Sequence, residues 1–284
     1  MDLKRIITGL VIGFAALYAL LYGSIWLVAM ITFIVIYGAK EYTDILKHKG
    51  FLPSFKIILV SSLLFGVLAY FKLCNFIPFL MVITSLAALM SVLFRGKQPY
   101  IANVATTIFG AIYCGWFPMH LLLLRNLGDK GVGGTYPYPE GAGYCVLLLF
   151  AVLVTDTFCY FVGCKLGKHK LSPVISPNKT IEGSVGGSLM CLIFSLGLGI
   201  PLGLPWYHAL ILGILIAGFA QIGDLCESMI KRDAGVKDSS NVLPGHGGFL
   251  DRTDSYILTI PVVYYYLLFF VQSNNILDFI RGLF

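Results

Sequence analysis

The chain has 284 residues, of which 58% are hydrophobic and only 12% are charged, and its formal net charge is +6. Because soluble domains carry charge on about a quarter of their residues, this composition excludes an ordinary soluble domain and indicates a polytopic membrane protein. The seven cysteines lie mostly in apolar segments and include no Cys-x-x-Cys pair, which favours small packing residues over disulfides or metal ligands.

Apolar runs long enough to cross a membrane recur along the whole chain. A hydrocarbon core about 30 Å thick needs roughly 20 apolar residues per helix, so we predict an all-α fold, a polytopic bundle of about nine transmembrane helices. The expected spans are 6–22, 24–40, 55–72, 76–94, 101–124, 143–164, 183–204, 207–230 and 255–272. Gly23 and Ser24 barely separate the first and second spans. Asn75 is the only clear polar residue between the third and fourth spans. A kinked or re-entrant hairpin is therefore the alternative for each pair, which leaves seven to nine spans.

Basic residues divide unevenly between the two sides of this nine-span arrangement. Of the 20 Lys and Arg residues, 16 fall on the side of the N-terminus. Since cytoplasmic loops carry the excess of positive charge, we expect a cell-membrane protein whose N-terminus and whose loops 165–182 and 231–254 are cytoplasmic, with the C-terminus outside. Residues 1–22 resemble a signal peptide, but no small-residue cleavage site follows, so an uncleaved first helix is expected.

The two halves of the chain differ in where their charges lie. Residues 1–125 hold the first five spans and few internal charges, which is typical of packing or lipid-facing helices. Lys40, Glu41 and Asp44 are expected to form a solvated helix end; the alternative is one wall of an entry groove for an anionic lipid. Residues 143–284 are expected to form the catalytic region.

Acidic residues gather where the last spans reach the expected cytoplasmic side. Asp156 lies inside the sixth span, Asp224 and Glu227 near the end of the eighth, and Asp251 and Asp254 at the start of the ninth. Residues three apart share a helix face, so two carboxylate pairs are expected to converge, which suits Mg²⁺. The alternatives are a structural partner for Asp156 and simple charge balance with nearby Lys and Arg for the others.

Basic and glycine-rich segments surround these acids. The loop 165–182 contains Lys165, Lys168, Lys170 and Lys179, and we expect it to form a basic rim and a turn before a helix whose glycines bind phosphate or permit close packing. Within it, His169 is expected to be solvated, and Glu182 to be either a charge favoured by the helix dipole or a site residue. Glycines on both sides of His246 let the backbone approach a ligand closely, and His246 could donate to a phosphate oxygen.

Residues 228–254 resemble the signature of the phosphatidate cytidylyltransferase family, the CDP-diacylglycerol synthases. The segment 176–187, and Asp156 followed by Tyr160 and Gly163, are also similar to this family, so the resemblance covers about residues 150–260. The positions of the signature are Ser228, Lys231, Arg232, Lys237, Asp238, Leu243, Pro244, His246, Gly247, Gly248, Asp251, Arg252 and Asp254.

The resemblance implies a Mg²⁺-dependent reaction of CTP with phosphatidic acid that gives CDP-diacylglycerol and pyrophosphate in phospholipid biosynthesis. The nucleophile would be a phosphate monoester that is already anionic, so the site needs positioning and electrostatics more than a strong base. The expected partners are the two substrates and the lipid bilayer, without a nucleic acid polymer; the sequence leaves room for a homodimer and for a second metal ion.

Site residues are assigned on the same resemblance. Asp224 and Asp251 are the expected first metal ligands, with Asp254 and Asp156 as second or outer ligands. Phosphate groups would be bound by the basic residues Lys231, Arg232, Lys237, Arg252 and Lys179. Orienting or hydrogen-bonding roles in substrate binding are expected for Ser228, Asp238 and His246. Gly247 and Gly248 are expected to bind substrate through their backbone. The catalytic set is Asp224, Asp251, Asp254, Lys231 and Arg232.

Four alternatives differ from this function in what they require of the sequence. A transporter or channel with buried acidic residues should place its charges near the midplane and show an internal repeat, and neither is found. A CDP-alcohol phosphotransferase should show a D-G-x-x-A-R opening, which is absent. A CTP-dependent synthase acting on an ether lipid phosphate stays open, whereas a purely structural bundle does not explain the charge cluster.

Overall fold

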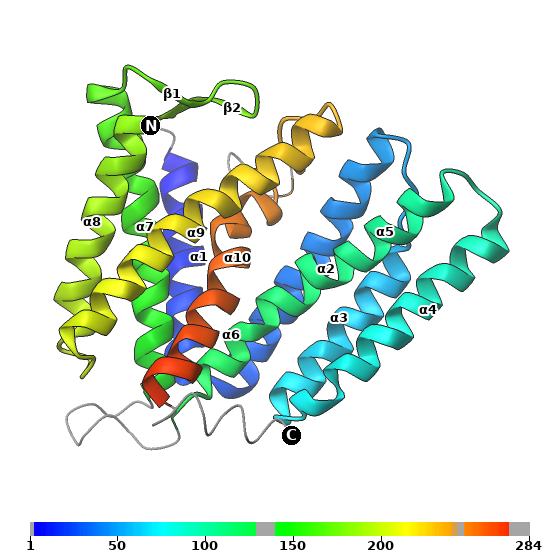
Figure 1. Cartoon of the computed structure of the whole chain (residues 1–284), viewed down its shortest axis with the longest axis horizontal. Helices are drawn as coiled ribbons and strands as arrows, with labels where there is room; N and C mark the ends of the chain where they lie inside the picture. The colour runs from blue at the N-terminus through cyan, green and yellow to red at the C-terminus, as the bar shows by residue number, and fades with distance from the viewer. Residues whose placement is uncertain (1–2, 129–139, 241, 243–246, 273–284) are drawn as a thin grey trace. The chain divides into compact units, whose positions relative to one another are not determined.

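The computed structural model describes residues 3–128, 140–240, 242 and 247–272 (Figure 1). Within those residues the chain is mainly helical, as predicted. The α-helices are α1 (Leu3–Tyr22), α2 (Ser24–His48), α3 (Phe55–Tyr70), α4 (Ile77–Arg95), α5 (Tyr100–Gly110), α6 (Phe117–Arg125), α7 (Glu140–Leu166), α8 (Ile181–Gly199), α9 (Trp206–Asp233) and α10 (Leu250–Leu267). Short 3₁₀ or π segments complete them: η1 (Cys74–Phe76), η2 (Ala111–Trp116) and η3 (Leu268–Gln272).

Seven helical segments of the described chain are long and apolar enough to cross a membrane. They are Ile25–His48, Cys74–Arg95, Tyr100–Arg125, Glu140–Leu166, Ile181–Gly199, Trp206–Asp233 and Leu250–Gln272. Two shorter apolar helices, Gly13–Tyr22 and Phe55–Tyr70, correspond to the first and third expected spans. The prediction of an all-α polytopic membrane bundle is confirmed, and the chain is a multi-pass membrane protein.

A small β-hairpin interrupts the helices where the sequence predicts only a basic rim and a turn. Strands β1 (Lys170–Ser172) and β2 (Ser176–Thr180) pair antiparallel, with Lys170 opposite Thr180 and Ser172 opposite Ser176. Such short, lysine-containing strands with Pro177 inside one of them lack the alternating apolar pattern that marks a strand in a sequence. The hairpin leads directly into α8, so it fixes the position of Lys179 at the helix entrance.

The first of two compact units consists of residues 1–123 and 226–257. Polar side chains of α5 hold the connection between α2 and α3: the Asn103 side-chain oxygen accepts from the Leu52 amide at 2.7 Å, and the Thr107 hydroxyl accepts from the Ser54 amide at 3.0 Å. Backbone groups buried in this way would otherwise lack partners, which is costly away from water. The unit therefore joins the N-terminal helices and residues 228–254 in one folded body.

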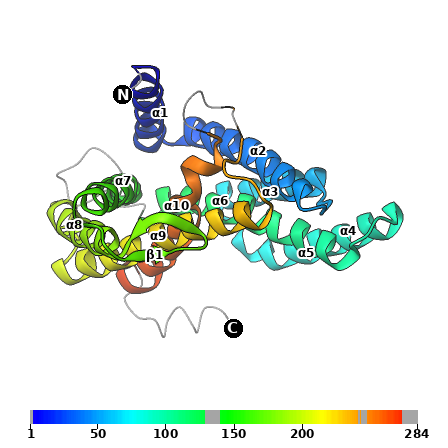
Figure 2. The same cartoon turned by 90° about the horizontal axis from the view of Figure 1, so that it is seen from above.

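The second unit consists of residues 124–225 and 258–284. Helices α7 and α8 lie side by side in both views (Figures 1 and 2). Glycines permit this close approach, as predicted: a Cβ on Gly187 would collide with the Cys159 sulfur and lie 2.7 Å from the Thr155 carbonyl oxygen of α7. Small residues at a helix interface are the usual means of tight packing within membranes.

We expect Gly187→Ala to lower the free energy of unfolding by about 1–3 kcal/mol, because the added methyl group overpacks the interface between α7 and α8. Gly197→Ala on the same helix is the matched control, since its Cβ would meet nothing within 4 Å. This control should be neutral or stabilising by up to about 1 kcal/mol, as alanine is the better helix former. Thermal unfolding in detergent measures both; equal melting temperatures for the two variants would contradict this packing account.

Candidate active site

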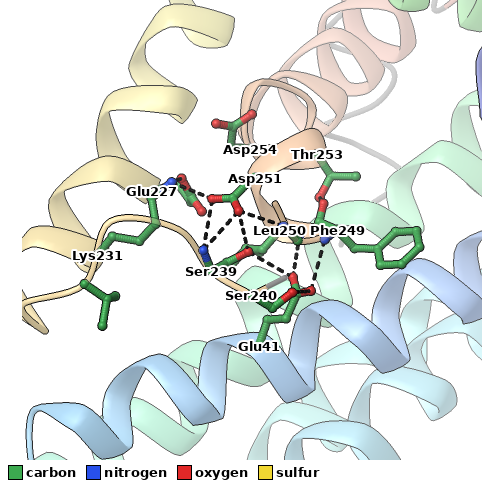
Figure 3. A network of polar contacts seen from close by, with 12 residues as sticks. Glu41, Glu227, Lys231, Ser239, Ser240, Phe249, Leu250, Asp251, Thr253 and Asp254 are labelled. Atoms are coloured by element: carbon green, nitrogen blue, oxygen red, sulfur yellow. Dashed lines mark hydrogen bonds and ion pairs between the residues drawn. The ribbon is translucent and has the colours of Figure 1, made fainter. Parts of the chain in front are cut away.

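The first unit gathers one lysine and two carboxylates where α9 ends and α10 begins (Figure 3). Lys231 Nζ lies 2.5 Å from the Glu227 carboxylate, one turn earlier in α9, and 2.6 Å from Asp251 Oδ1 in the first turn of α10. The three side chains are 11%, 0% and 7% exposed, respectively. One ammonium therefore faces two buried carboxylates, and Asp254 adds a further negative charge near Glu227.

Asp251 is fixed by hydrogen bonds as well as by the ion pair. Its Oδ2 accepts from the Ser239 hydroxyl at 2.8 Å, the Ser239 amide at 3.0 Å and the Gly248 amide at 2.8 Å. Charge-assisted hydrogen bonds of this kind are about twice as strong as neutral ones. The carboxylate is thereby held in one orientation, with Oδ1 directed at Lys231.

The two glycines after His246 permit this arrangement. Gly247 has φ +76°, and a Cβ there would lie 2.5 Å from Asp251 Oδ2. A Cβ on Gly248 would collide with the Ser239 hydroxyl and with Glu41. Both glycines were expected to let the backbone approach a ligand closely; in this structure they let it approach Asp251 and Glu41. His246 itself, with Leu243 and Pro244, lies outside the described residues.

A second group of predicted site residues lies in the other unit. Lys179, at the end of β2, forms an ion pair of 2.6 Å with Asp224 of α9. Asp156, Lys179 and Asp224 all lie close enough to Cys159 of α7 to act on it electrostatically. The sequence-predicted residues of this unit are therefore brought together, as a lysine with two aspartates.

Hydrogen bonds between helices hold this second group in place. Gln221, one turn before Asp224, is hydrogen-bonded to the Ser184 hydroxyl and donates to the Ser188 hydroxyl of α8 at 3.0 Å. Thr180 caps α8, and its hydroxyl accepts from the Gly183 amide at 3.2 Å. The α9 carboxylate and the hairpin lysine are thus positioned by two neighbouring elements of the same unit.

Glu182 and His169 fasten the base of the hairpin. The Glu182 carboxylate lies 2.6 Å from His169 Nδ1 and accepts from the Lys168 amide at 3.0 Å and the His169 amide at 3.2 Å. The prediction of a merely solvated His169 is therefore wrong, although the ring is exposed. Of the two roles left open for Glu182, its position in the first turn of α8 agrees with a charge favoured by the helix dipole, and its carboxylate also connects α8 to the hairpin.

The remaining predicted site residues lie at the surface. Arg232, Lys237, Asp238 and Arg252 are exposed, and Ser228 and Asp254 are half-buried. Arg232 also donates to the Val236 carbonyl at 3.3 Å at the end of α9. Exposed cations of this kind are accessible to phosphate groups.

Across the described residues, no group of three or more His, Cys, Asp or Glu forms a ready metal site. Asp251 belongs to the first unit and Asp224 to the second.

Glu41 is the residue that the sequence-based interpretation missed. It was expected to be solvated, but it is 3% exposed, because α2 continues to His48 instead of ending near residue 40. Its partners Ser239 and Ser240 were not singled out either. Extending the helical periodicity past residue 40 would have predicted that Glu41 is buried, because Glu41 shares a buried helix face with Gly38 and Ile45.

A multi-pass helical membrane protein with clustered carboxylates and cations near its helix ends has the fold and the groups of a membrane enzyme that handles phosphates. The sequence profile of the cytidylyltransferase family matches residues 3–270, so the chain belongs to this family, whose members are nucleotidyltransferases. The resemblance inferred from residues 228–254 is thereby confirmed.

Relatives support the same family over different lengths. The chain is 37% identical to a phosphatidate cytidylyltransferase of Synechocystis sp. over 97% of this chain and 99% of that protein. It is 41% identical to a Bacillus subtilis phosphatidate cytidylyltransferase over 59% of this chain and 60% of the relative. It is 32% identical to the chloroplastic phosphatidate cytidylyltransferase 4 of Arabidopsis thaliana over 93% of this chain and 73% of that protein.

Proposed function

We propose that this enzyme transfers the cytidylyl group of CTP to phosphatidic acid, giving CDP-diacylglycerol and pyrophosphate for phospholipid biosynthesis. The observation that carries the proposal is the similarity to the Synechocystis phosphatidate cytidylyltransferase along 97% of this chain. The cluster of Lys231 and Asp251 from the signature segment with the preceding Glu227 supports it independently.

In this reaction an oxygen of the lipid phosphate forms a bond to the α-phosphorus of CTP. The bond from that phosphorus to the oxygen leading to the β-phosphate breaks, and pyrophosphate leaves. The lipid phosphate is already anionic, so the chain's residues act by binding and orienting phosphates instead of by removing a proton. Exposed Arg232, Lys237 and Arg252 are suited to bind them, and the ion-paired Lys179 and Lys231 are suited to neutralise charge.

We also propose that Mg²⁺ is required. The donor set fits this ion, because the groups are carboxylate oxygens and the buried Glu227, which pairs with Lys231 through Oε2, has an Oε1 that accepts no hydrogen bond within the described part of the chain. Asp251 and Asp254 in one unit, and Asp224 and Asp156 in the other, are the residues that would hold it. When bound, the ion would neutralise the negative charge that develops on the leaving pyrophosphate. That Asp224 and Asp251 hold the same ion, and that a second ion binds, remain predictions.

The proposed location is the cell membrane, with the N-terminus and the loops 165–182 and 231–254 in the cytoplasm. Its support is that 16 of the 20 basic residues lie on one side of the nine-span arrangement. CTP and pyrophosphate are soluble, so a cytoplasmic site would give both direct access. A homodimer remains a prediction.

Purified protein given labelled CTP, Mg²⁺ and phosphatidic acid tests this function directly. We expect a labelled liponucleotide and an equal amount of pyrophosphate, with at least about a 100-fold loss on adding excess EDTA and recovery on restoring Mg²⁺. Diacylglycerol, which lacks the phosphate nucleophile, is the control substrate and should give no product. Product from an ether lipid phosphate but none from phosphatidic acid would replace the proposed substrate, and no liponucleotide from either would overturn the proposal.

A further inference from the structure

Glu41 of α2 is a buried carboxylate that is held entirely by one distant segment of the chain (Figure 3). Its Oε1 accepts from the Ser240 hydroxyl at 2.6 Å and the Phe249 amide at 3.1 Å. Its Oε2 accepts from the Leu250 amide at 2.7 Å and the Ser239 hydroxyl at 3.2 Å. All four donors are about 200 residues away in sequence, at 198 to 209 positions.

A carboxylate at 3% exposure is costly to bury unless its charge is compensated. Glu41 forms no ion pair with any basic side chain of the described chain, so its compensation comes from hydrogen bonds and from the end of α10. Helix N-termini present unsatisfied amides and the positive end of the helix dipole, which together favour an anion. The amides of Phe249 and Leu250 are such groups, so Glu41 caps α10 from another helix.

Ser239 connects this cap to the predicted catalytic carboxylate. Its hydroxyl lies 3.2 Å from Glu41 Oε2 and 2.8 Å from Asp251 Oδ2. A hydroxyl has a single proton, so it donates to one carboxylate at a time while both hold its position. The Ser239 amide also donates to Asp251, at 3.0 Å. A displacement of Ser239 would therefore be transmitted to the carboxylate that pairs with Lys231.

Aromatic contacts attach the same segment to α2 independently of Glu41. The Phe249 ring centroid lies 5.1 Å from that of Phe33 and 5.0 Å from that of Tyr37, both on α2. Aromatic pairs at such distances contribute about 0.5–1.5 kcal/mol beyond the burial of their surface. The segment should therefore stay docked on α2 when the Glu41 charge is removed, which separates orientation from folding.

We propose that Glu41 is a positioning residue of the cytidylyltransfer site. It fixes Ser239 and the first turn of α10 so that the Asp251 carboxylate keeps one orientation toward Lys231. The inference rests on the proposed function for the chemistry, but its structural basis is the set of hydrogen bonds from α2 to residues 239–250. A cap that served stability alone would lower the melting temperature without changing how the folded enzyme binds or turns over CTP.

Glu41→Gln is the decisive variant, because it keeps the size of the side chain but places an N–H₂ group against two donors. We expect kcat/KM to fall about 10- to 100-fold, the usual cost of losing a group that orients a catalytic ligand. The rise in melting temperature that CTP and Mg²⁺ induce in the wild type should shrink in parallel, which is a binding readout separate from turnover. Asp44→Asn is the matched control: this carboxylate is on the same helix, but it is exposed and pairs only with Lys47 among the described residues.

Variants of Ser239 and Ser240 distinguish a role of Glu41 in positioning Asp251 from a role in capping α10 alone. Ser240 donates to Glu41 alone, whereas Ser239 contacts both Glu41 and Asp251. Ser239→Ala should therefore reduce kcat/KM much more than Ser240→Ala, and combining Ser239→Ala with Glu41→Gln should cost little more than either change alone. If Glu41→Gln fails to fold, this pair of serine variants decides between the two roles.

The two proposals fail in different ways. Absence of liponucleotide synthesis by the wild type would remove the proposed function. An active wild type, with a Glu41→Gln variant that keeps its kcat/KM within about twofold and shows an undiminished CTP-induced shift, would overturn the positioning role alone. Equal effects of Ser239→Ala and Ser240→Ala would also overturn it.

Discussion

Asp251→Asn should remove nearly all CTP-dependent turnover, with a loss of at least about 100-fold in kcat. The carboxylate has donors on both oxygens: Lys231 at Oδ1, and Ser239 and Gly248 at Oδ2. An asparagine amide must direct its N–H₂ group at one of these donors and cannot keep both sets of contacts. It also removes the negative charge that would bind a divalent cation.

Asp233→Asn is the control for this variant. Asp233 forms an exposed ion pair with Lys49 at 2.9 Å, so the same chemical change there should cost at most about 1 kcal/mol and leave turnover intact. Both variants should reach the membrane and elute as folded protein from a sizing column in detergent. An Asp251→Asn variant with the turnover of the wild type would exclude Asp251 from the reaction site.

Lys231→Met should have the largest effect on stability. Glu227 and Asp251 would then face each other without a cation, at 0% and 7% side-chain exposure. Removing one partner of a buried ion pair costs about 3–5 kcal/mol, because it leaves an uncompensated buried charge. We expect a lower melting temperature in detergent together with loss of turnover. Lys49→Met removes the exposed pair with Asp233 and should change stability by no more than about 1 kcal/mol.

A second substitution separates the two consequences of losing Lys231. Adding Glu227→Gln to Lys231→Met removes one of the two opposed charges, so part of the lost stability should return while turnover stays low. Thermal unfolding and the CTP assay measure the two effects side by side. If the double variant were less stable than Lys231→Met alone, charge repulsion would not be the reason for the destabilisation.

The helices could be predicted because each membrane span needs about 20 consecutive apolar residues, and such a run can be recognised in the sequence without knowing the rest of the fold. The apolar runs therefore located the spans of α7 and α9 to within a few residues. The β-hairpin could not be found in this way, since β1 and β2 are stabilised by pairing with each other and by the clasp of Glu182 instead of by an apolar face.

The candidate site was predictable where spacing along one helix decides contacts. Glu227 and Lys231, four apart on α9, form an ion pair, and the acids near the ends of α9 and α10 were recognised as a cluster. The environment of Glu41 was not predictable, because its donors follow it by about 200 residues and only the folded chain brings them together. A charged residue directly after a span's expected end was taken as solvated, whereas the helix continues to His48 beside residues 239–250.

The cap on α10 by Glu41 also determines which fragments of the chain would keep an aligned site. A fragment that begins at Glu140 would keep the whole signature segment and every residue with an expected chemical role, yet it would lack the carboxylate that anchors Ser239 and Leu250. Transplanting that C-terminal stretch onto another membrane scaffold would therefore carry over the reactive groups without their alignment, unless the graft also supplied an acid in the place of Glu41.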